Sequence, residues 1–184
     1  MSALLWIYRH RNYLVSPPLI FAFAFNQYEI EADGLIWPLA IVTVLAGIAL
    51  RIWGQQHLHF RVGMRKQLTT TGPYRFVRNP LYIGNTIMCV GATIASKLLW
   101  LIPITFFWCI GIYSAVALYE ERHLVEKYGD GYRRHLLEVP RWLPKGLRFK
   151  NLDLINENLY RVAPIEFTGV LILLPYIIKE ILNR

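Results

Sequence analysis

Residues 98–118 read LLWLIPITFFWCIGIYSAVAL, a run of 21 residues that contains no charged side chain. An α-helix rises about 1.5 Å per residue, so about 20 apolar residues match the roughly 30 Å hydrocarbon core of a bilayer. A second run, residues 35–53, contains only one charge, Arg51, near enough to its end for the side chain to snorkel toward the interface. These two runs predict membrane-spanning helices, and therefore an integral membrane protein.

Three weaker apolar runs lie around them. Residues 13–28 carry no charge, although the Pro17–Pro18 pair bends or delays a helix there. Residues 81–96 are also uncharged but short, and only Lys97 separates them from the next run, which predicts a tight helical hairpin. Residues 162–178 contain Glu166 near their start and form either a fifth span or a helix on the membrane surface.

The sequence thus predicts an all-α, polytopic membrane bundle of four or five transmembrane helices, with residues 1–184 as a single domain. Only 17% of the residues are charged, below the roughly 25% typical of a soluble domain. The net charge of +8 reflects basic loops, and no nucleic-acid module accompanies it, so we expect contacts with anionic lipid headgroups and no nucleic-acid partner.

Charges are sorted between the loops. Residues 55–79 contain five Lys or Arg and no acid, residues 120–161 contain nine Lys or Arg, and residues 26–34 contain three acids and no base. Basic loops stay in the cytoplasm, which predicts a cytoplasmic N-terminus, two long cytoplasmic loops and an outward-facing Lys97 hairpin. Lys97 is the one charge that breaks the pattern.

The first basic loop leads into a helix start. Residues 68–84 read LTTTGPYRFVRNPLYIG, in which Gly72-Pro73 signals a turn and Asn79-Pro80 predicts an N-cap followed by the first helical residue. The free amides and the positive dipole end of such a helix suit a carboxylate or phosphate. The flanking rings of Tyr74 and Tyr82 could stack on a base or attract a cation. Simple capping with interfacial tyrosines would give the same pattern.

The second basic loop begins with two acids, Glu120 and Glu121, directly after the span at 98–118. Carboxylates at a helix C-terminus oppose the dipole, so they need compensation unless the helix continues into the loop. A bound cation, a ligand amine or ribose hydroxyls would supply it, and so would Arg122 or another local base. The histidines near this face lack the His-x-x-x-His spacing of a helical zinc site, so we expect no metal.

These loops resemble the superfamily of isoprenylcysteine carboxyl methyltransferases and phospholipid methyltransferases, which are membrane enzymes. The resemblance covers residues 55–144, about half of the chain. It consists of several motifs in the family's order: Gly-Pro-Tyr, Arg-Asn-Pro-Leu-Tyr-Ile-Gly, Glu-Glu after a helical hairpin, Tyr-Gly-Asp-Gly-Tyr and Val-Pro-Arg-Trp-Leu-Pro.

The resemblance implies that S-adenosylmethionine binds at the cytoplasmic helix ends. Carried over by position, the cofactor-binding residues are His59, Lys66, Gln67, Leu68, Thr69, Tyr74, Asn79, Pro80, Leu81, Tyr82, Glu120 and Glu121. The reaction is then a direct in-line methyl transfer to a lipophilic acceptor that enters from the bilayer. A carboxylate or thiolate acceptor needs no general base, whereas for an amine acceptor Glu121 or His123 could remove the proton.

Two departures leave the acceptor open. Isoprenylcysteine enzymes usually have His at the position of Asn79, and their eukaryotic members place a substrate-binding Arg at the position of Val116. Phospholipid N-methyltransferases share Asn-Pro-x-Tyr-x-Gly and Leu-Tyr-Glu-Glu but lack the same Val-Pro-Arg-Trp-Leu-Pro tail. The main prediction is a methyltransferase for an isoprenylcysteine-type carboxylate or a lipid, with a phospholipid N-methyltransferase as the alternative. Two rival hypotheses belong to different classes, a sterol-reductase-like oxidoreductase and a non-catalytic membrane protein, and the oligomeric state stays open.

Overall fold

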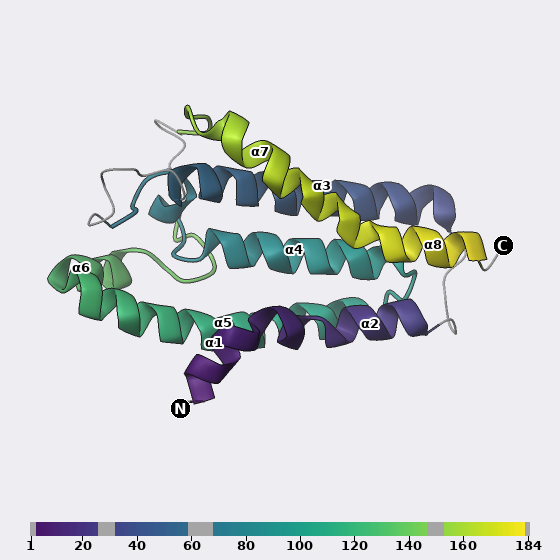
Figure 1. Ribbon diagram of the computed structural model, residues 1–184, viewed down its shortest axis with the longest axis horizontal. Coiled ribbons are helices and arrows are strands. Elements are labelled where there is room, and N and C mark those ends of the chain that lie inside the picture. Colours follow the sequence, from purple (N-terminus) through teal and green to yellow (C-terminus); the bar gives the residue numbers. More distant parts are fainter. Residues whose placement is uncertain (1–2, 26–31, 59–67, 147–152, 183–184) are drawn as a thin grey trace.

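The computed structural model describes residues 3–25, 32–58, 68–146 and 153–182. Within these ranges the protein contains α-helices and 3₁₀ helices and no β-strand, which confirms the all-α prediction. Three helices form its centre: α3 (Asp33–Leu58), α4 (Pro80–Ala95) and α5 (Leu101–Tyr128). They lie along the long axis of the molecule, with α4 between α3 and α5 (Figure 1). In the described part of the chain, α3 and α5 are long and apolar enough to cross a membrane, and α4 is a shorter apolar helix.

Small residues bring α3 and α4 close together. A methyl group added to Gly47 would lie 2.7 Å from the Gly84 carbonyl oxygen, and one added to Gly91 would lie 3.0 Å from the Val44 nitrogen. Helices in membranes pack by such close approach, since lipid gives no hydrophobic drive for their association. A methyl group added to Gly54 would lie 2.8 Å from Leu81 Cδ2, so this close packing extends to the end of α3 and the start of α4, where the polar loops begin.

The helix boundaries differ from the sequence prediction at three places. The first run is not one helix over 13–28, because α1 (Ala3–Val15) and α2 (Pro17–Ala24) are separated at Ser16, where proline prevents continuation. The hairpin turn is longer than Lys97 alone, since α5 begins only at Leu101. Helix α5 also continues past residue 118 to Tyr128, so Glu120 and Glu121 lie within a helix and not at its end.

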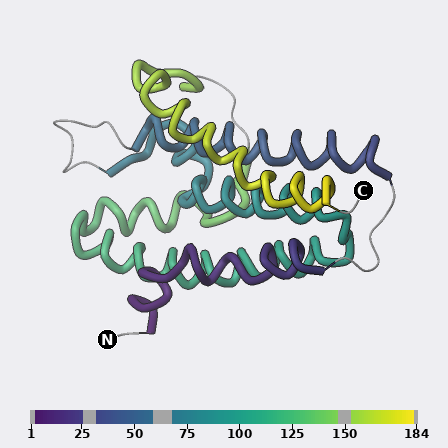
Figure 2. The backbone as a smooth tube through the Cα atoms, turned by 45° about the vertical axis from the view of Figure 1, so that its right-hand side comes forward, coloured from purple at the N-terminus to yellow at the C-terminus, as the bar shows by residue number. Residues whose placement is uncertain are grey.

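The C-terminal segment consists of α7 (Leu159–Phe167), the 3₁₀ helix η2 (Thr168–Leu173) and α8 (Leu174–Leu182). It crosses α3 obliquely, with α7 and η2 packed on α3 and α8 reaching α2 (Figures 1 and 2). At one end the Asn156 amide donates to Gln56 Oε1 at 3.0 Å, and at the other the Lys179 ammonium donates to the Phe25 carbonyl at 2.6 Å. The segment is therefore tied to the bundle at both ends.

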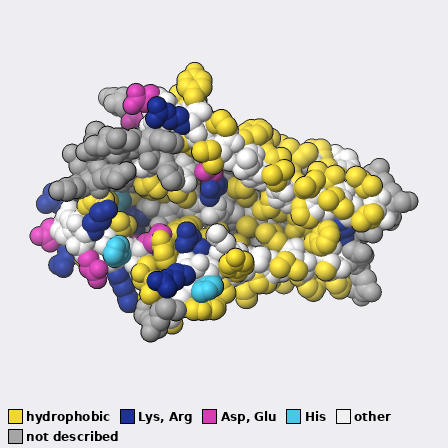
Figure 3. Space-filling model, in the orientation of Figure 1, with side chains coloured by type: hydrophobic (Ala, Val, Ile, Leu, Met, Phe, Trp, Pro, Cys, Tyr) yellow, Lys and Arg dark blue, Asp and Glu magenta, His cyan; other side chains and the backbone are white. Residues whose placement is uncertain are grey.

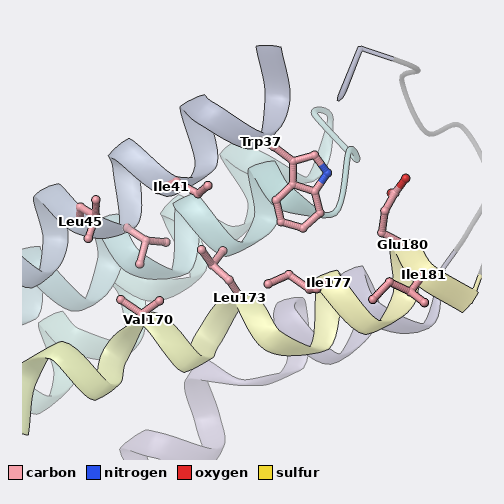
Figure 4. A pocket seen from close by; sticks show the side chains of 9 residues that line it. Trp37, Ile41, Leu45, Val170, Leu173, Ile177, Glu180 and Ile181 are labelled. Carbon is pink, nitrogen blue, oxygen red and sulfur yellow. The ribbon is translucent and has the colours of Figure 1, made fainter. Parts of the chain in front are cut away.

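An apolar pocket of about 440 Å³ lies between α3 and this C-terminal segment. Trp37, Ile41 and Leu45 of α3 face Val170, Leu173 and Ile177 across it (Figure 4). Glu180 is the charged residue in its lining, and it is bound to Lys97. Ligand sites usually combine apolar walls with a few polar groups that orient the ligand. Here the charged group is already bound to Lys97, so nothing in the pocket indicates a ligand.

Lys97 is the charge that broke the loop pattern, and it is buried in the turn between α4 and α5, with a left-handed φ of 64°. Its Nζ lies 2.6 Å from Asp33 Oδ1 and 2.6 Å from Glu180 Oε2. The ammonium therefore joins the start of α3, the α4–α5 turn and α8, which explains a lysine at this end of the bundle.

The first testable prediction concerns this three-residue cluster. Replacing Lys97 by methionine (Lys97→Met) keeps the Cβ, and hence the backbone strain, but removes the cation between two carboxylates. Breaking a buried pair costs about 3–5 kcal/mol, and the partial exposure of Asp33 reduces the expected loss to about 1–3 kcal/mol. Thermal unfolding in detergent, followed by tryptophan fluorescence, should show a lower midpoint for Lys97→Met than for the control Lys97→Arg. Equal midpoints for the two variants would contradict a stabilising role of the cluster.

Candidate functional site

Charged side chains gather at one end of the molecule. Lys, Arg, Asp, Glu and His surround a hollow at the end that carries α6 (Asp130–Glu138), while the surface toward α8 is almost entirely hydrophobic (Figure 3). The hollow contains a cavity of about 600 Å³, within the roughly 300–1,000 Å³ typical of small-molecule sites. Helices α1, α3, α4, α5 and α6 and the loop before α4 all contribute to its wall.

Seven predicted site residues line this cavity: Tyr74, Asn79, Pro80, Leu81, Tyr82, Glu120 and Glu121. Leu68 and Thr69 are half-buried and do not line it. His59, Lys66 and Gln67 lie outside the described residues. His123 is exposed on α5, where it lies 3.6 Å from Glu126, so the structure does not bring this candidate base to the cavity.

The loop before α4 is fixed from behind by His57. The short 3₁₀ helix η1 (Gly72–Arg75) begins at Gly72, which has a left-handed φ of 57°. A methyl group on Gly72 would overlap the His57 ring, so only glycine permits this approach. The His57 ring contacts Thr71 Oγ1 through Nδ1 and the Asp153 carbonyl through Nε2, each at 3.0 Å. This packing sets the position of Tyr74 in the cavity wall.

Helix α4 begins at Pro80 as predicted, and Asn79 occupies the N-cap position. The Asn79 side chain makes no capping hydrogen bond, so that part of the prediction is wrong. In the described part of the chain, Asn79 Nδ2 and Gln55 Oε1 are buried in the cavity wall without a hydrogen-bond partner. Buried polar atoms nearly always have partners, so one unpaired donor and one unpaired acceptor in a cavity wall fit a polar ligand.

Tyr82 and Glu120 meet inside the cavity. The Tyr82 hydroxyl donates a 2.8 Å hydrogen bond to Glu120 Oε1, and its ring stacks on Tyr113 with 4.7 Å between the centroids. Because α5 continues beyond both glutamates, the opposing helix dipole predicted there does not arise. Glu120 therefore lies against the cavity as a positioned carboxylate with a hydroxyl partner.

Glu121 differs from its neighbour, because two arginines engage its carboxylate. Arg141 binds it with both ends of its guanidinium, at 3.0 Å to Oε1 and 2.6 Å to Oε2, and Arg78 Nε lies 3.1 Å from Oε1. This bidentate bond raises the pKa of Arg141. Both oxygens of Glu121 are thus already occupied, which favours a positioning role for this residue over proton transfer.

Tyr132 of α6 closes the cavity beside this ion pair. Burial, followed by the negative charge of Glu121, raises the pKa of Tyr132 to about 12, so its hydroxyl stays protonated at neutral pH and can donate a hydrogen bond. The cavity wall also contains residues that the sequence did not predict there, namely Tyr132, Gln55, Arg51, Tyr8 and Arg11. The signal that could have pointed to Tyr132 is its place in the Tyr-Gly-Asp-Gly-Tyr motif.

Together, these observations define a helical protein with apolar helices of membrane length and a polar cavity at one end of the bundle. The pattern that describes the phospholipid methyltransferase family matches residues 31–131, which is more than half of the chain. The protein belongs to this family.

Two curated relatives are also similar to the chain. The protein-S-isoprenylcysteine O-methyltransferase of Schizosaccharomyces pombe is 30% identical over 142 residues, which cover 72% of this chain and 56% of that protein. The Delta(14)-sterol reductase LBR of Gallus gallus is 26% identical over 107 residues, 56% of this chain and 16% of that protein. The chain thus spans about half the length of the first relative and a small part of the second. No solved structure matches.

The second testable prediction follows from the packing of Gly72. The variant Gly72→Ala places a methyl group against His57 at a left-handed backbone position, which should lower stability by about 1–3 kcal/mol. Gly111→Ala is the matched control, because Gly111 lies in α5 with no atom within 4 Å of an added methyl group. Thermal unfolding should show a lower midpoint for the first variant only, and similar midpoints would contradict the tight contact.

Proposed function

We propose that this protein is a membrane methyltransferase that moves a methyl group from S-adenosylmethionine to a lipophilic acceptor. The observation that carries the proposal is the Tyr82–Glu120 hydrogen bond inside a cavity that the family's motifs surround. The family match and the isoprenylcysteine O-methyltransferase relative support the reaction class.

The cavity residues fit the polar parts of such a nucleotide. Glu120 can accept hydrogen bonds from ribose hydroxyls or an amine, and the unpaired atoms of Asn79 and Gln55 offer one donor and one acceptor. Tyr74 and Tyr82 also line the cavity, and their rings can stack on a base or attract a cationic sulfur. S-adenosylmethionine supplies an activated methyl group when bound.

The contribution of the chain itself is alignment and the exclusion of water. Holding two reactants in line can lower a barrier by roughly 7–11 kcal/mol in favourable cases. The ion pair of Glu121 with Arg78 and Arg141 fixes three segments around the cavity, so its geometry is set before a ligand binds. A carboxylate or thiolate acceptor would need no base, and a phospholipid amine, the alternative acceptor, would need one.

We also propose that the chain crosses the membrane several times with the N-terminus and the cavity in the cytoplasm. The partition of charged and apolar surface supports this orientation. The C-terminal segment extends from one end of the bundle to the other, which supports a fifth crossing rather than a helix on the membrane surface.

The third testable prediction concerns this orientation. Lys97 is buried and is a poor position for labelling, so the exposed Trp100 is the better reporter of the outer end. In a background without the two native cysteines, which are both buried, Trp100→Cys should react with a membrane-impermeant maleimide from outside intact cells. Arg133→Cys on α6 should react only after the membrane is permeabilised. Labelling of both from the same side would contradict the topology.

The fourth testable prediction concerns nucleotide binding. Calorimetry on the detergent-purified protein should show micromolar-range binding of S-adenosylhomocysteine and none of reduced nicotinamide adenine dinucleotide phosphate. Glu120→Ala should weaken the binding by about tenfold, or about 1.4 kcal/mol, because the polar contact in the cavity is lost. Glu126→Ala, an exposed acid on the same helix, is the matched control and should bind normally.

The result also separates the rival functions. Binding of the reduced nicotinamide nucleotide alone would favour the reductase hypothesis, to which the LBR relative points. Binding of neither nucleotide would favour a non-catalytic membrane protein. An unchanged affinity in Glu120→Ala would remove Glu120 from the proposed site.

A further inference from the structure

A second buried ion pair lies deeper in the bundle than the one at Glu121. Arg51 of α3 donates from Nε to Glu166 Oε2 of α7 at 2.6 Å, and its Nη1 donates to Asn85 Oδ1 of α4. The side chains of Arg51 and Glu166 are only 22% and 8% exposed. The expectation that Arg51 snorkels to the interface is therefore wrong, because its guanidinium points between the helices.

Arg51 lies where two cavities meet. Arg51, Asn85 and Asn12 belong both to the wall of the 600 Å³ cavity and to that of a second cavity of about 450 Å³. The second cavity extends between α1, α2, α4 and η2, and much of its remaining wall is apolar, with Val15, Leu19, Met88, Ile165 and Ile172. A ligand lying across the junction would have a polar group at Arg51 and a hydrocarbon part in the second cavity.

Ionisable groups inside a membrane bundle are costly, and they usually mark substrate paths or pair with one another. Arg51 does both of these things, since it is paired with Glu166 and it faces the cavity in which we place the nucleotide. Its planar guanidinium suits a carboxylate ligand, as its present partner shows. Val116, where the resemblance expects a substrate-binding Arg, carries no charge and lines neither cavity, so it cannot take that role.

We propose that Arg51 binds the carboxylate of a lipophilic acceptor, and that Glu166 occupies this place until the acceptor arrives. The inference rests on the proposed methyltransferase function and on the carboxylate acceptor to which the isoprenylcysteine O-methyltransferase relative points, and it adds the two residues that would recognise that carboxylate. The acceptor's carboxylate displaces Glu166 from the guanidinium, and its hydrocarbon chain lies in the second cavity.

The reaction balances without a base. A lone pair of the carboxylate oxygen forms the new C–O bond to the methyl carbon, the C–S bond breaks, and its electron pair stays on sulfur. The products are a methyl ester and S-adenosylhomocysteine, and no proton moves. This agrees with a site in which Glu121 is held by two arginines and His123 faces away from the cavity.

The competing interpretation is that the ion pair is a structural clamp that only ties α7 to α3. The two interpretations predict different effects of substitutions on acceptor binding. Under a clamp, Arg51→Gln and Glu166→Gln both loosen the same contact and weaken acceptor binding alike. Under the proposal they act in opposite directions, because Glu166→Gln removes the competing carboxylate while the guanidinium remains.

The test uses calorimetry on the full chain with N-acetyl-S-farnesylcysteine and with its methyl ester, which lacks the carboxylate charge. The wild-type protein should bind the acid more tightly than the ester by about tenfold or more, and Arg51→Gln should abolish this preference. Glu166→Gln should tighten binding of the acid by about threefold or more. Glu180→Gln is the control, because it disturbs an ion pair at the far end of the same C-terminal segment. It should change neither the affinity for the acid nor the preference for the acid over the ester.

A second measurement separates this inference from the proposed function. S-adenosylhomocysteine should bind Arg51→Gln and the wild-type protein with affinities within about twofold of each other. Weaker nucleotide binding would make Arg51 a nucleotide ligand and overturn the inference. Weaker acid binding in Glu166→Gln would also overturn it, in favour of the clamp. If Arg51→Gln does not fold, Arg51→Lys replaces it and should retain part of the preference for the acid.

A wild-type protein that binds no nucleotide would refute the proposed function, whereas the comparison of acid and ester would still test the carboxylate site. Dioleoylphosphatidylethanolamine serves as the competing acceptor. If it displaces the bound acid from the wild-type protein but not from Arg51→Gln, the site recognises a phosphate headgroup and the carboxylate assignment is overturned.

Discussion

The site depends on one carboxylate, that of Glu121, held between the guanidinium groups of Arg141 and Arg78. Three segments far apart in the sequence meet there, namely the loop before α4, the extended end of α5 and the tail after α6. Arg78 also donates to the Leu136 and Val139 carbonyl oxygens at 2.7 and 3.0 Å, so it fixes the tail as well. Such a pair is costly to bury and stabilises little on balance, but it specifies one arrangement of its neighbours.

The other buried charges are also paired inside the protein. Lys97 lies between Asp33 and Glu180 at the apolar end, and Arg51 faces Glu166 inside the bundle. A charge within an apolar environment must find its partner inside the protein, so each pair also joins helices that the backbone connects only distantly. The pairs differ in what surrounds them, since Arg51 faces two cavities whereas the Lys97 cluster belongs to the packing of helix ends.

Much of this could be predicted from the sequence. Apolar runs indicated α3, α4 and α5, and Asn79-Pro80 located the start of α4 correctly, because helix length and proline are local signals. The extension of α5 to Tyr128 was missed, although Gly129 directly after it is a common local signal for a helix end. The partners of Glu121 could not be predicted, since they come from the tail after α6 and the loop before α4, which only the fold brings together. Gln55 was missed because it lies in a segment with an ordinary sequence and reaches the cavity only through the fold. Tyr132 lies in the Tyr-Gly-Asp-Gly-Tyr motif, but only the packing of α6 brings that motif to the cavity.

Position in space, and not position in the sequence, decides which residue can recognise a substrate. Charge recognition depends on distance and burial and not on which helix carries the charge. An arginine at position 116 of α5 and the arginine at position 51 of α3 could therefore bind the same carboxylate, provided that each reached the junction of the two cavities. Val116 is fully buried, whereas Arg51 lies at that junction with an acid already bound to it. A missing motif residue is therefore weak evidence for a lost function when another helix places the same chemistry beside the cavity.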